Sequence, residues 1–347
     1  MNTRSLSRTA FLIGALCLAS QQPSRAQSDV ERFYAKTPIR LISAAGPGSG
    51  FTIWAHFLAQ YLGKFVPGNP SIVVESMPGA GGLTATNYTY VIAPKDGSVI
   101  LSIPREAPIL STMGAKGVQF DSTRFSWLGS PTTDTDVCFE RQDAPWKALP
   151  DYYSKELLVG SDGVGSGTHI FPIAVNAILG TKFKVIDGYA DTGTVFLAVD
   201  RGEIHGSCQS AETLLKARGP ALASGALKLV LQSGLKPDPA FGGVPFVMDL
   251  AKTEEERQAL TFLFASMTLG RPFVVPPGTP PDRIAVLRKA FGDLFKDPDF
   301  LSAAKDLHYN INPMSGDDLQ KIVDDVAATP RNIVTRVAGL IEPPGTR

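Results

Sequence analysis

Three glycine-rich segments between predicted strands and helices are the parts of this sequence best suited to bind a ligand. They read Gly46-Pro47-Gly48-Ser49-Gly50, Pro78-Gly79-Ala80-Gly81-Gly82 and Asp162-Gly163-Val164-Gly165-Ser166-Gly167-Thr168. A helix that begins after such a turn presents unpaired backbone N–H groups and about half a positive charge, and glycine lets a ligand come close to them. Two such turns that face each other across a cleft would hold a small organic anion by its carboxylates.

Side chains beside these turns have both a binding and a structural interpretation. Arg105 follows a predicted strand and either pairs with an anionic ligand or lies in solvent beside Glu106. His169, at a helix start, either donates to a carboxylate or stays on the surface. Phe51 is a candidate pocket residue, whereas Trp54 lies on an apolar helical stripe and is expected in the core.

The predicted ligand-binding set combines the turns with their polar neighbours. Its threonines at helix starts either cap the helix, touch the ligand or do both. The set is Ala45, Gly46, Pro47, Gly48, Ser49, Gly50, Phe51, Thr52, Gly79, Ala80, Gly81, Gly82, Arg105, Ser161, Gly165, Ser166, Gly167, Thr168, His169, Thr192, Gly193 and Thr194.

The sequence lacks the common local motifs of catalysis and metal binding. The first segment has no third glycine of a dinucleotide fingerprint, and no glycine-rich loop carries the lysine of a phosphate-loop NTPase. No G-x-S-x-G elbow occurs, and no two histidines stand at metal-ligand spacing. We therefore predict no catalytic residue, metal or cofactor. An exported hydrolase that uses Ser161 or Ser166 with His169 is kept as an alternative.

Strands and helices alternate in the first half of the chain. Strands predicted at 38–45, 71–76 and 98–103 alternate with helices at 53–65 and 83–93. The first of these helices would be capped by the threonine that precedes it. This βαβαβ order predicts a parallel sheet, and the loops that follow its strands then meet at the carboxyl edge, where open α/β sheets bind ligands.

A second unit of the same kind follows, and the chain then returns. Four more strands are predicted, at 157–161, 182–186, 204–208 and 227–231. A helix after the third glycine segment ends at Leu179, and a strand-like run near 268–275 precedes C-terminal helices.

This order predicts an α/β fold with two lobes joined by two crossings. Lobe 1 is expected to contain residues 27–128 and 262–347, and lobe 2 residues 129–261.

The N-terminus has the anatomy of a secretory signal peptide. A basic region with Arg4 and Arg8 precedes an apolar run from Ala10 to Ala19, and small residues stand three and one positions before a cut after Ala26. The apolar run is too short to span a bilayer. We predict a signal peptide of residues 1–26, export, and a mature chain that does not insert into the membrane.

The charge balance gives no reason to expect a polyanionic partner. The chain has 33 basic and 33 acidic residues, and loss of the three signal arginines leaves a net charge of about −3. That charge is too mild to indicate nucleic acid.

Two cysteines remain after cleavage, Cys138 and Cys208. An oxidising compartment permits a disulfide between them, but two buried free thiols are the expectation from sequence.

Five motifs, taken in order, resemble those of the Bug receptors, the substrate-binding proteins of tripartite tricarboxylate transporters. They are Thr37-Pro38-Ile39-Arg40-Leu41-Ile42, Pro78-Gly79-Ala80-Gly81-Gly82, Ala93-Pro94-Lys95-Asp96-Gly97, Gly165-Ser166-Gly167-Thr168 and Pro276-Pro277-Gly278-Thr279-Pro280. The resemblance implies a periplasmic receptor of the Venus-flytrap, type II-like binding-protein fold, whose lobes close on a carboxylate. It also implies membrane permease subunits as partners, and we expect a monomer.

The resemblance further implies how the ligand is held. Receptors of this family bind one carboxylate mainly through backbone groups and ordered waters, at turns that match residues 45–52 and 78–82. The turn that matches 161–168 and the helix start at 192–194 contact the ligand from the other lobe.

Some positions depart from the family pattern. Thr52 replaces an aspartate, and Ala190-Asp191 replaces a lysine-glycine pair. Acidic Asp191 and Asp162 would repel a second carboxylate, so the expectation extends to a monocarboxylate or an amine-bearing acid. The sequence thus predicts a periplasmic solute-binding protein for a small organic carboxylate that serves a tripartite tricarboxylate-type transporter. A ligand-sensing receptor for a signalling partner is the other alternative.

Overall fold

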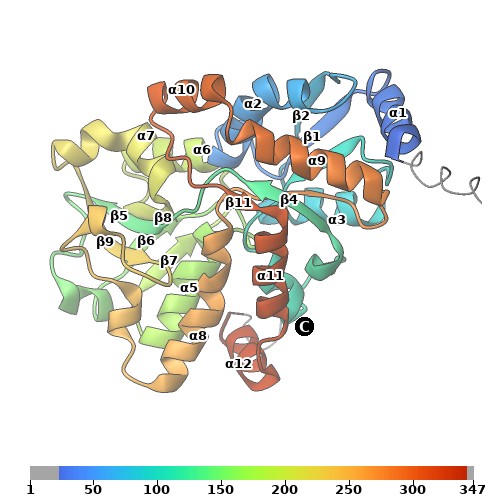
Figure 1. Cartoon of the computed structure of the whole chain (residues 1–347). Coiled ribbons are helices and arrows are strands. Elements are labelled where there is room, and N and C mark those ends of the chain that lie inside the picture. The colour runs from blue at the N-terminus through green and yellow to red at the C-terminus, as the bar shows by residue number, and fades with distance from the viewer. Residues whose placement is uncertain (1–22, 342–347) are drawn as a thin grey trace, which may run out of the picture.

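Two mixed β-sheets, each covered by helices, form the protein (Figure 1). The structure is a computed structural model and describes residues 23–341. The predicted signal peptide lies outside these residues except for its last four, which begin helix α1 (Pro23–Tyr34). Cleavage after Ala26 therefore stays a prediction.

The first sheet has six strands in the order β11-β4-β10-β3-β1-β2. Their bounds in that order are Met314–Ser315, Ser126–Ser130, Phe273–Val275, Val99–Ser102, Ile39–Ser43 and Ile72–Ser76. β1 pairs in parallel with both β2 and β3, which confirms the predicted βαβαβ unit, whereas β10 is antiparallel to β3 and β4. The turns after β1, β2 and β3 consequently emerge at one edge.

The second sheet has five strands in the order β7-β6-β8-β5-β9. Their bounds in that order are Phe183–Ile186, Leu157–Gly160, Gly206–Ser210, Asp136–Arg141 and Leu227–Ser233. The parallel pair of β6 and β7 was predicted. β5 was not, although it lies antiparallel between β8 and β9 and pairs with both.

Helices cover both sheets. They are α2 (Gly50–Leu62), α3 (Leu83–Val91), α4 (Ala107–Met113), α5 (Gly167–Leu179), α6 (Thr192–Asp200), α7 (Ala211–Ala223), α8 (Glu254–Ala265), α9 (Pro281–Leu294), α10 (Pro298–Asp306), α11 (Gly316–Ala327) and α12 (Arg331–Ile341). Trp54 on α2 is 1% exposed, as its place on the apolar stripe predicts, and its ring packs 4.1 Å from that of Tyr309.

The chain passes between the sheets twice, between β4 and β5 and again between α8 and β10, which confirms the two predicted crossings. α12 packs against α5 and α8, beside which it lies in Figure 1. One apolar cluster includes Leu101 of the first sheet and Val159 of the second, together with Phe171 and Phe264, whose rings lie 5.3 Å apart. The two lobes therefore share part of their core, and the exact lobe boundaries stay a prediction.

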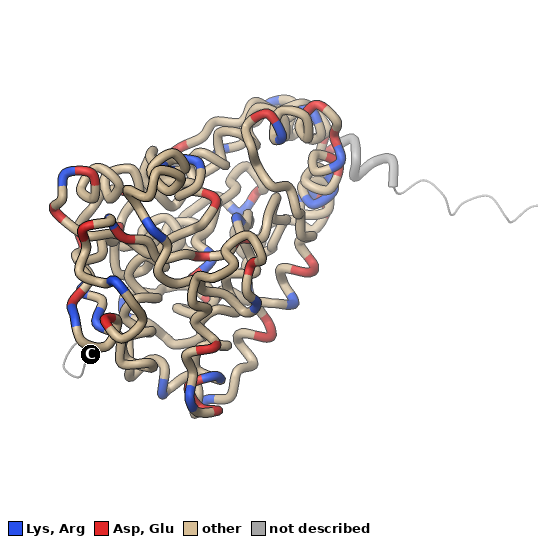
Figure 2. The backbone as a smooth tube through the Cα atoms, turned by 90° about the vertical axis from the view of Figure 1, so that its left-hand side faces the viewer, with Lys and Arg blue, Asp and Glu red and all other residues tan. Residues whose placement is uncertain are grey.

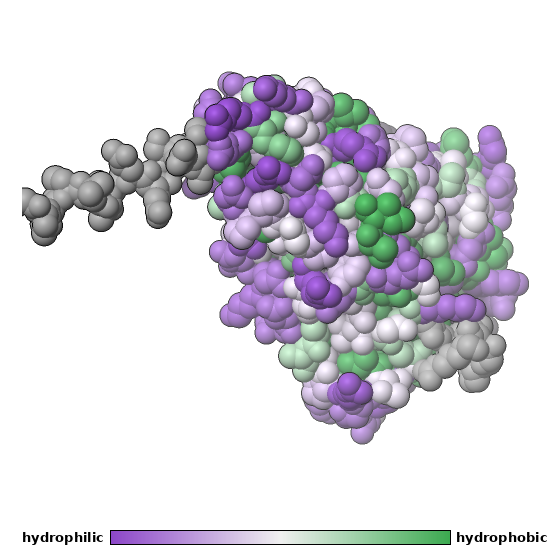
Figure 3. Space-filling model, turned by 90° about the vertical axis from the view of Figure 1, so that its right-hand side faces the viewer, coloured by the Kyte–Doolittle hydropathy of each residue, from purple (hydrophilic) through white to green (hydrophobic). Residues whose placement is uncertain are grey.

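Acidic and basic residues are interspersed along the chain in Figure 2, without a large region of one sign on the face shown. On the face in Figure 3, hydrophobic residues form separate groups among hydrophilic ones. Within residues 23–341, no helix is both long enough and apolar enough to cross a bilayer.

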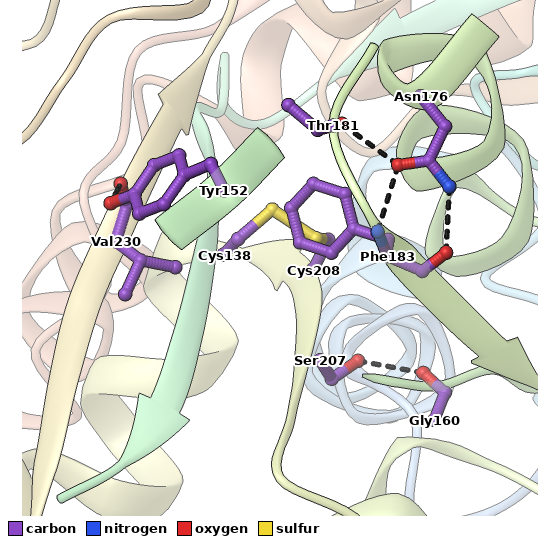
Figure 4. Close-up of a disulfide and its surroundings, with 9 residues drawn as sticks. All are labelled: Cys138, Tyr152, Gly160, Asn176, Thr181, Phe183, Ser207, Cys208 and Val230. Carbon is purple, nitrogen blue, oxygen red and sulfur yellow. Dashed lines mark hydrogen bonds between the residues drawn. A yellow bond between two sulfur atoms is a disulfide. The ribbon is translucent and has the colours of Figure 1, made fainter. Parts of the chain in front are cut away.

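Cys138 and Cys208 form a disulfide, so the expectation of free thiols is wrong. The two residues lie directly opposite each other on antiparallel strands β5 and β8, with Cα atoms 3.9 Å apart. Figure 4 shows the bond with Tyr152 and Phe183 near it, and these residues belong to the same buried apolar cluster. Sequence could not show this pairing because the two cysteines are 70 residues apart and β5 was not recognised.

Removing the disulfide should lower stability without changing the fold. A bond that closes a loop of this length contributes about 2–4 kcal/mol, mainly by restricting the unfolded chain. Urea unfolding of the Cys138→Ser/Cys208→Ser variant should show this loss, and reductant should destabilise the wild type but not the variant. Labelling of both cysteines by iodoacetamide in the absence of reductant, read by peptide mass, would contradict the bond.

Candidate functional site

The first turn, after β1, is fixed by hydroxyl groups inside the loop. Ser49 caps α2, because its Oγ accepts from Phe51 N at 3.3 Å. Thr52 is 1% exposed, and its Oγ1 lies 2.7 Å from Ser43 Oγ and donates to Gly46 O at 2.8 Å. The predicted capping role of Thr52 is therefore wrong, and its side chain holds the turn from within.

The second turn, after β2, follows a left-handed path that requires glycine. Gly79, Gly81 and Gly82 have φ values of 136°, 65° and 94°, which residues with a Cβ rarely adopt. Gly82 also packs closely, since a Cβ there would lie 2.4 Å from Pro104 Cγ. The conformation and packing of this turn therefore require glycine, independently of any contact with a ligand.

The third turn, after β6, is cross-linked by its own side chains. Thr168 Oγ1 donates to Asp162 Oδ1 at 2.6 Å and lies 2.6 Å from Ser166 Oγ. Ser161 is fully buried, and its Oγ accepts from Gly163 N at 3.0 Å. Asp162 therefore uses one carboxylate oxygen to stabilise its own turn.

The serine–histidine contact that a hydrolase would need is not formed. His169 Nδ1 lies 2.8 Å from Asp187 Oδ1, and Ser166 Oγ donates to Gly163 O at 2.9 Å. Among the hydrogen bonds of residues 23–341, none joins the His169 imidazole to the hydroxyl of Ser161 or Ser166, and the one bond between His169 and Ser166 is the backbone bond from His169 N to Ser166 O at 3.1 Å. The arrangement therefore gives this alternative no support.

The second and third turns come from different lobes and touch each other. A Cβ built on Gly81 would lie 2.2 Å from Ser166 N, and one on Gly165 would lie 2.4 Å from Ala80 O. Because real Cβ atoms do not come this close to backbone, the two lobes can meet here only through glycine. The lobes are closed on each other in this structure.

A second contact joins the first turn to the start of α6. Asp191 is 8% exposed, and its Oδ1 accepts from Thr194 N at 2.9 Å and so caps α6. Its Oδ2 accepts from Gly48 N of the other lobe at 2.8 Å. A Cβ on Gly48 would lie 2.8 Å from that same oxygen. Asp191 thus links the lobes, a role that the sequence did not reveal.

A cavity of about 700 Å³, including its mouth, lies between these turns. The predicted residues that line it are Ala45, Gly46, Ser49, Gly50, Phe51, Gly79, Gly81, Gly82, Arg105, Ser166, Gly167, Thr168 and Thr192. Those that do not are Pro47, Gly48, Thr52, Ala80, Ser161, Gly165, His169, Gly193 and Thr194. Three of the latter, Gly48, Gly193 and Thr194, line a neighbouring outer groove. The cavity is thus lined by residues of all three glycine-rich turns.

Further residues line the cavity that sequence reasoning did not include in the binding set. They are Ala44, Pro78, Pro104, Glu106, Asp136, Asp162, Ala190, Gln209, Ser210, Thr213 and Arg271. Arg271 lies on the second crossing segment, and Asp136 is the first residue of β5, directly after the first crossing. These two parts of the chain meet only when it is folded. The prediction that the site lies between lobes joined by two crossings was the one signal that could have pointed to them.

Buried ion pairs form part of the cavity wall. Arg105 forms ion pairs with Asp136, with Glu106 at 3.1 Å and with Asp134 at 3.5 Å, and Arg271 lies 3.2 Å from Asp134. These five side chains are each between 3% and 5% exposed. Arg105 is therefore buried and paired, and the interpretation of it as a solvated surface arginine is wrong.

The acids of this cluster outnumber its arginines, and the pKa values of Asp136 and Arg105 are both raised. Burial, reinforced by Asp134 and Glu106, raises the pKa of Asp136 to about 6 against the opposing effect of Arg105. Burial lowers the pKa of Arg105, but its three carboxylate neighbours more than reverse this and the net shift is upward. Burial thus acts on the two groups in opposite directions, whereas the neighbouring carboxylates raise the pKa of both.

Asp136 should make stability depend on pH in weakly acidic solution. Its pKa in the folded protein lies above the value of 3.8 for a free side chain, so its stabilising effect is complete below about pH 4 and is lost as pH rises through about 6. The free energy of unfolding of wild type relative to Asp136→Asn should fall across this range, by on the order of 1–3 kcal/mol. Urea unfolding at several pH values measures it. The exposed variant Asp143→Asn should show no such fall, and a flat difference curve for Asp136→Asn would contradict the assignment.

Gly48→Ala should weaken the contact between the lobes, because the added Cβ displaces the Asp191 carboxylate. The expected loss is about 1–2 kcal/mol of unfolding free energy. In an Asp191→Ala background the same change should cost much less, and this non-additivity identifies the contact. Gly292→Ala, where a Cβ meets no atom within 4 Å, is the matched control. Equal losses in both backgrounds would refute the link.

No protein-family model matches the chain. A UPF0065 protein of Bordetella bronchiseptica is 23% identical over 337 residues, which cover 94% of this chain and 89% of that protein. The solved structure of the periplasmic binding protein BugD is 18% identical with a TM-score of 0.69, and it covers 88% of this chain and 98% of that one.

A second solved structure, MatC from Rhodopseudomonas palustris with bound malate, gives the same picture. It is 18% identical with a TM-score of 0.67, over 88% of this chain and 99% of its own. The chain therefore has the two-lobed fold of periplasmic binding proteins, and its likeness to these proteins over nearly its whole length confirms the resemblance to the Bug receptors that its motifs indicate.

Proposed function

We propose that this protein captures a small organic carboxylate in the periplasm and delivers it to the permease of a tripartite tricarboxylate-type transporter. The observation that carries the proposal is the cavity between glycine-rich turns of two lobes. Gly50 and Gly167, the first residues of helices α2 and α5, line it from opposite lobes. Backbone N–H groups at such helix starts favour an anion.

The related proteins support the same reading. MatC holds malate, a dicarboxylate, in a chain of the same fold. The predicted N-terminal signal sequence agrees with an exported protein that acts outside the cytoplasm. The monomeric state and the permease partner are part of the proposal.

Closure provides the mechanism of capture. The ligand enters when the lobes are apart, and its carboxylate then bonds to N–H groups from both lobes, so that it stabilises the closed state. Contacts such as Gly48 with Asp191 and Trp54 Nε1 with Glu212 Oε1 at 2.7 Å already favour closure. These contacts therefore reduce the binding free energy that the ligand must supply to close the lobes.

A thermal-shift panel tests the proposal. Mono-, di- and tricarboxylates at millimolar concentration should include at least one that raises Tm by several degrees, since binding to the folded state stabilises it. Gly50→Val should abolish the shift, because a Cβ there already meets Thr213 Oγ1 at 2.4 Å. Gly219→Val, in open space on α7, is the control. The proposal would be contradicted if sugars or metal ions raised Tm and no acid did.

A further inference from the structure

We propose that the ligand carries one carboxylate and, at its other end, a hydrogen-bond donor without negative charge, which Gln209 and Asp136 recognise. This inference rests on the proposed function and adds the substrate class. It separates two kinds of acid that the fold alone would accept equally, dicarboxylates and monocarboxylates with an amide, hydroxyl or amine.

Gln209 is the first observation. It lies on β8, lines the cavity, and is 4% exposed. Neither its Oε1 nor its Nε2 has a hydrogen-bond partner among the described residues. Buried amide groups are almost always paired, and leaving one unpaired is costly. An amide that offers both a donor and an acceptor is best satisfied by a ligand group that also has both.

Asp136 lines the same cavity as this amide. In the β5–β8 pair Asp136 faces Ser210 and Val137 faces Gln209, so the Asp136 and Gln209 side chains leave the sheet on opposite faces. Asp136 Oδ2 is buried and has no hydrogen-bond partner among residues 23–341, while Oδ1 pairs with Arg105. The cavity wall therefore contains a second buried acceptor that lacks a donor.

The charges of this region disfavour a second carboxylate. Arg105 and Arg271 are the two cations here, and three buried acids, Glu106, Asp134 and Asp136, already surround them. A further buried anion would raise the excess of negative charge from one to two. Burial of a charge without a matching partner is expensive, so a second carboxylate, without helix N–H groups of its own, would be rejected.

The ligand's single carboxylate is then left to the backbone N–H groups of the helix starts. Ser49, Gly50, Gly167 and Thr192 line the cavity at the first turns of α2, α5 and α6. Asp191 already bonds to Gly48 N on the outer side of the first turn. One carboxylate of the ligand is consequently enough to complete the contacts at the glycine turns.

Calorimetric titration of the purified protein with four short acids tests the inference. Succinate and succinamate differ only in a carboxylate or an amide, 4-aminobutyrate offers an ammonium, and butyrate offers no polar group. Succinamate or 4-aminobutyrate should bind at least about 10-fold more tightly than succinate and than butyrate. Preference for succinamate assigns recognition mainly to Gln209, and preference for 4-aminobutyrate assigns it mainly to Asp136.

Variants of Gln209 connect the preference to this residue. Gln209→Leu keeps the volume and removes both hydrogen bonds, so succinamate should lose about 10-fold or more in affinity while butyrate changes little. Gln209→Glu should favour 4-aminobutyrate over succinamate more strongly than wild type does. Gln258→Leu, at an exposed site on α8, is the matched control, and circular dichroism checks folding.

The outcomes separate this inference from the proposed function. If acids bind but succinate binds most tightly, or butyrate as tightly as succinamate, the inference is wrong while the carboxylate receptor stands. Wild-type ligand preferences in both Gln209 variants would also overturn it. If none of the four short acids binds and the wider acid panel gives no thermal shift, the proposed function itself fails.

Discussion

The close approach of backbone to backbone between the lobes is the constraint on which the site depends. Gly81 meets Gly165 and Ser166 at distances that no Cβ would allow, and Gly48 lets the Asp191 carboxylate reach its N–H group. Only with these contacts do the helix starts of both lobes surround one small cavity. The glycines therefore act twice, first in allowing the lobes to close and then in leaving N–H groups accessible to an anion.

Closure also creates the buried ion pairs. Arg105 belongs to the first lobe and Asp136 to the second, so their pairing exists only when the lobes are together. Such a pair contributes little net stability, because the cost of removing the charges from water offsets their attraction. Its effect is on selectivity: the cluster presents to the ligand a desolvated surface with one more acid than arginines, whereas the helix starts at the glycine-rich turns present backbone N–H donors.

Two acidic residues of the second lobe have structural roles that their residue type alone does not reveal. Asp162 stabilises its own turn through Thr168, and Asp191 caps α6 and bonds across the cleft. Both remain negative charges near the cavity and still oppose a second carboxylate. Their hydrogen bonds explain why acids are tolerated so close to turns that bind anions, since each carboxylate has N–H or O–H donors of its own.

The sequence by itself determined the local architecture. Periodic apolar residues defined α2 and α5, alternating strands and helices defined the parallel units, and glycine segments located the turns, because these features depend on neighbours along the chain. The tertiary structure alone decided which residues meet. Capping by Ser49 instead of Thr52, the Cys138–Cys208 bond and the inner cavity wall with Gln209 all depend on contacts between segments far apart or on turn geometry. The local periodicity of the sequence gives no information about those contacts, although they determine the chemistry of the site.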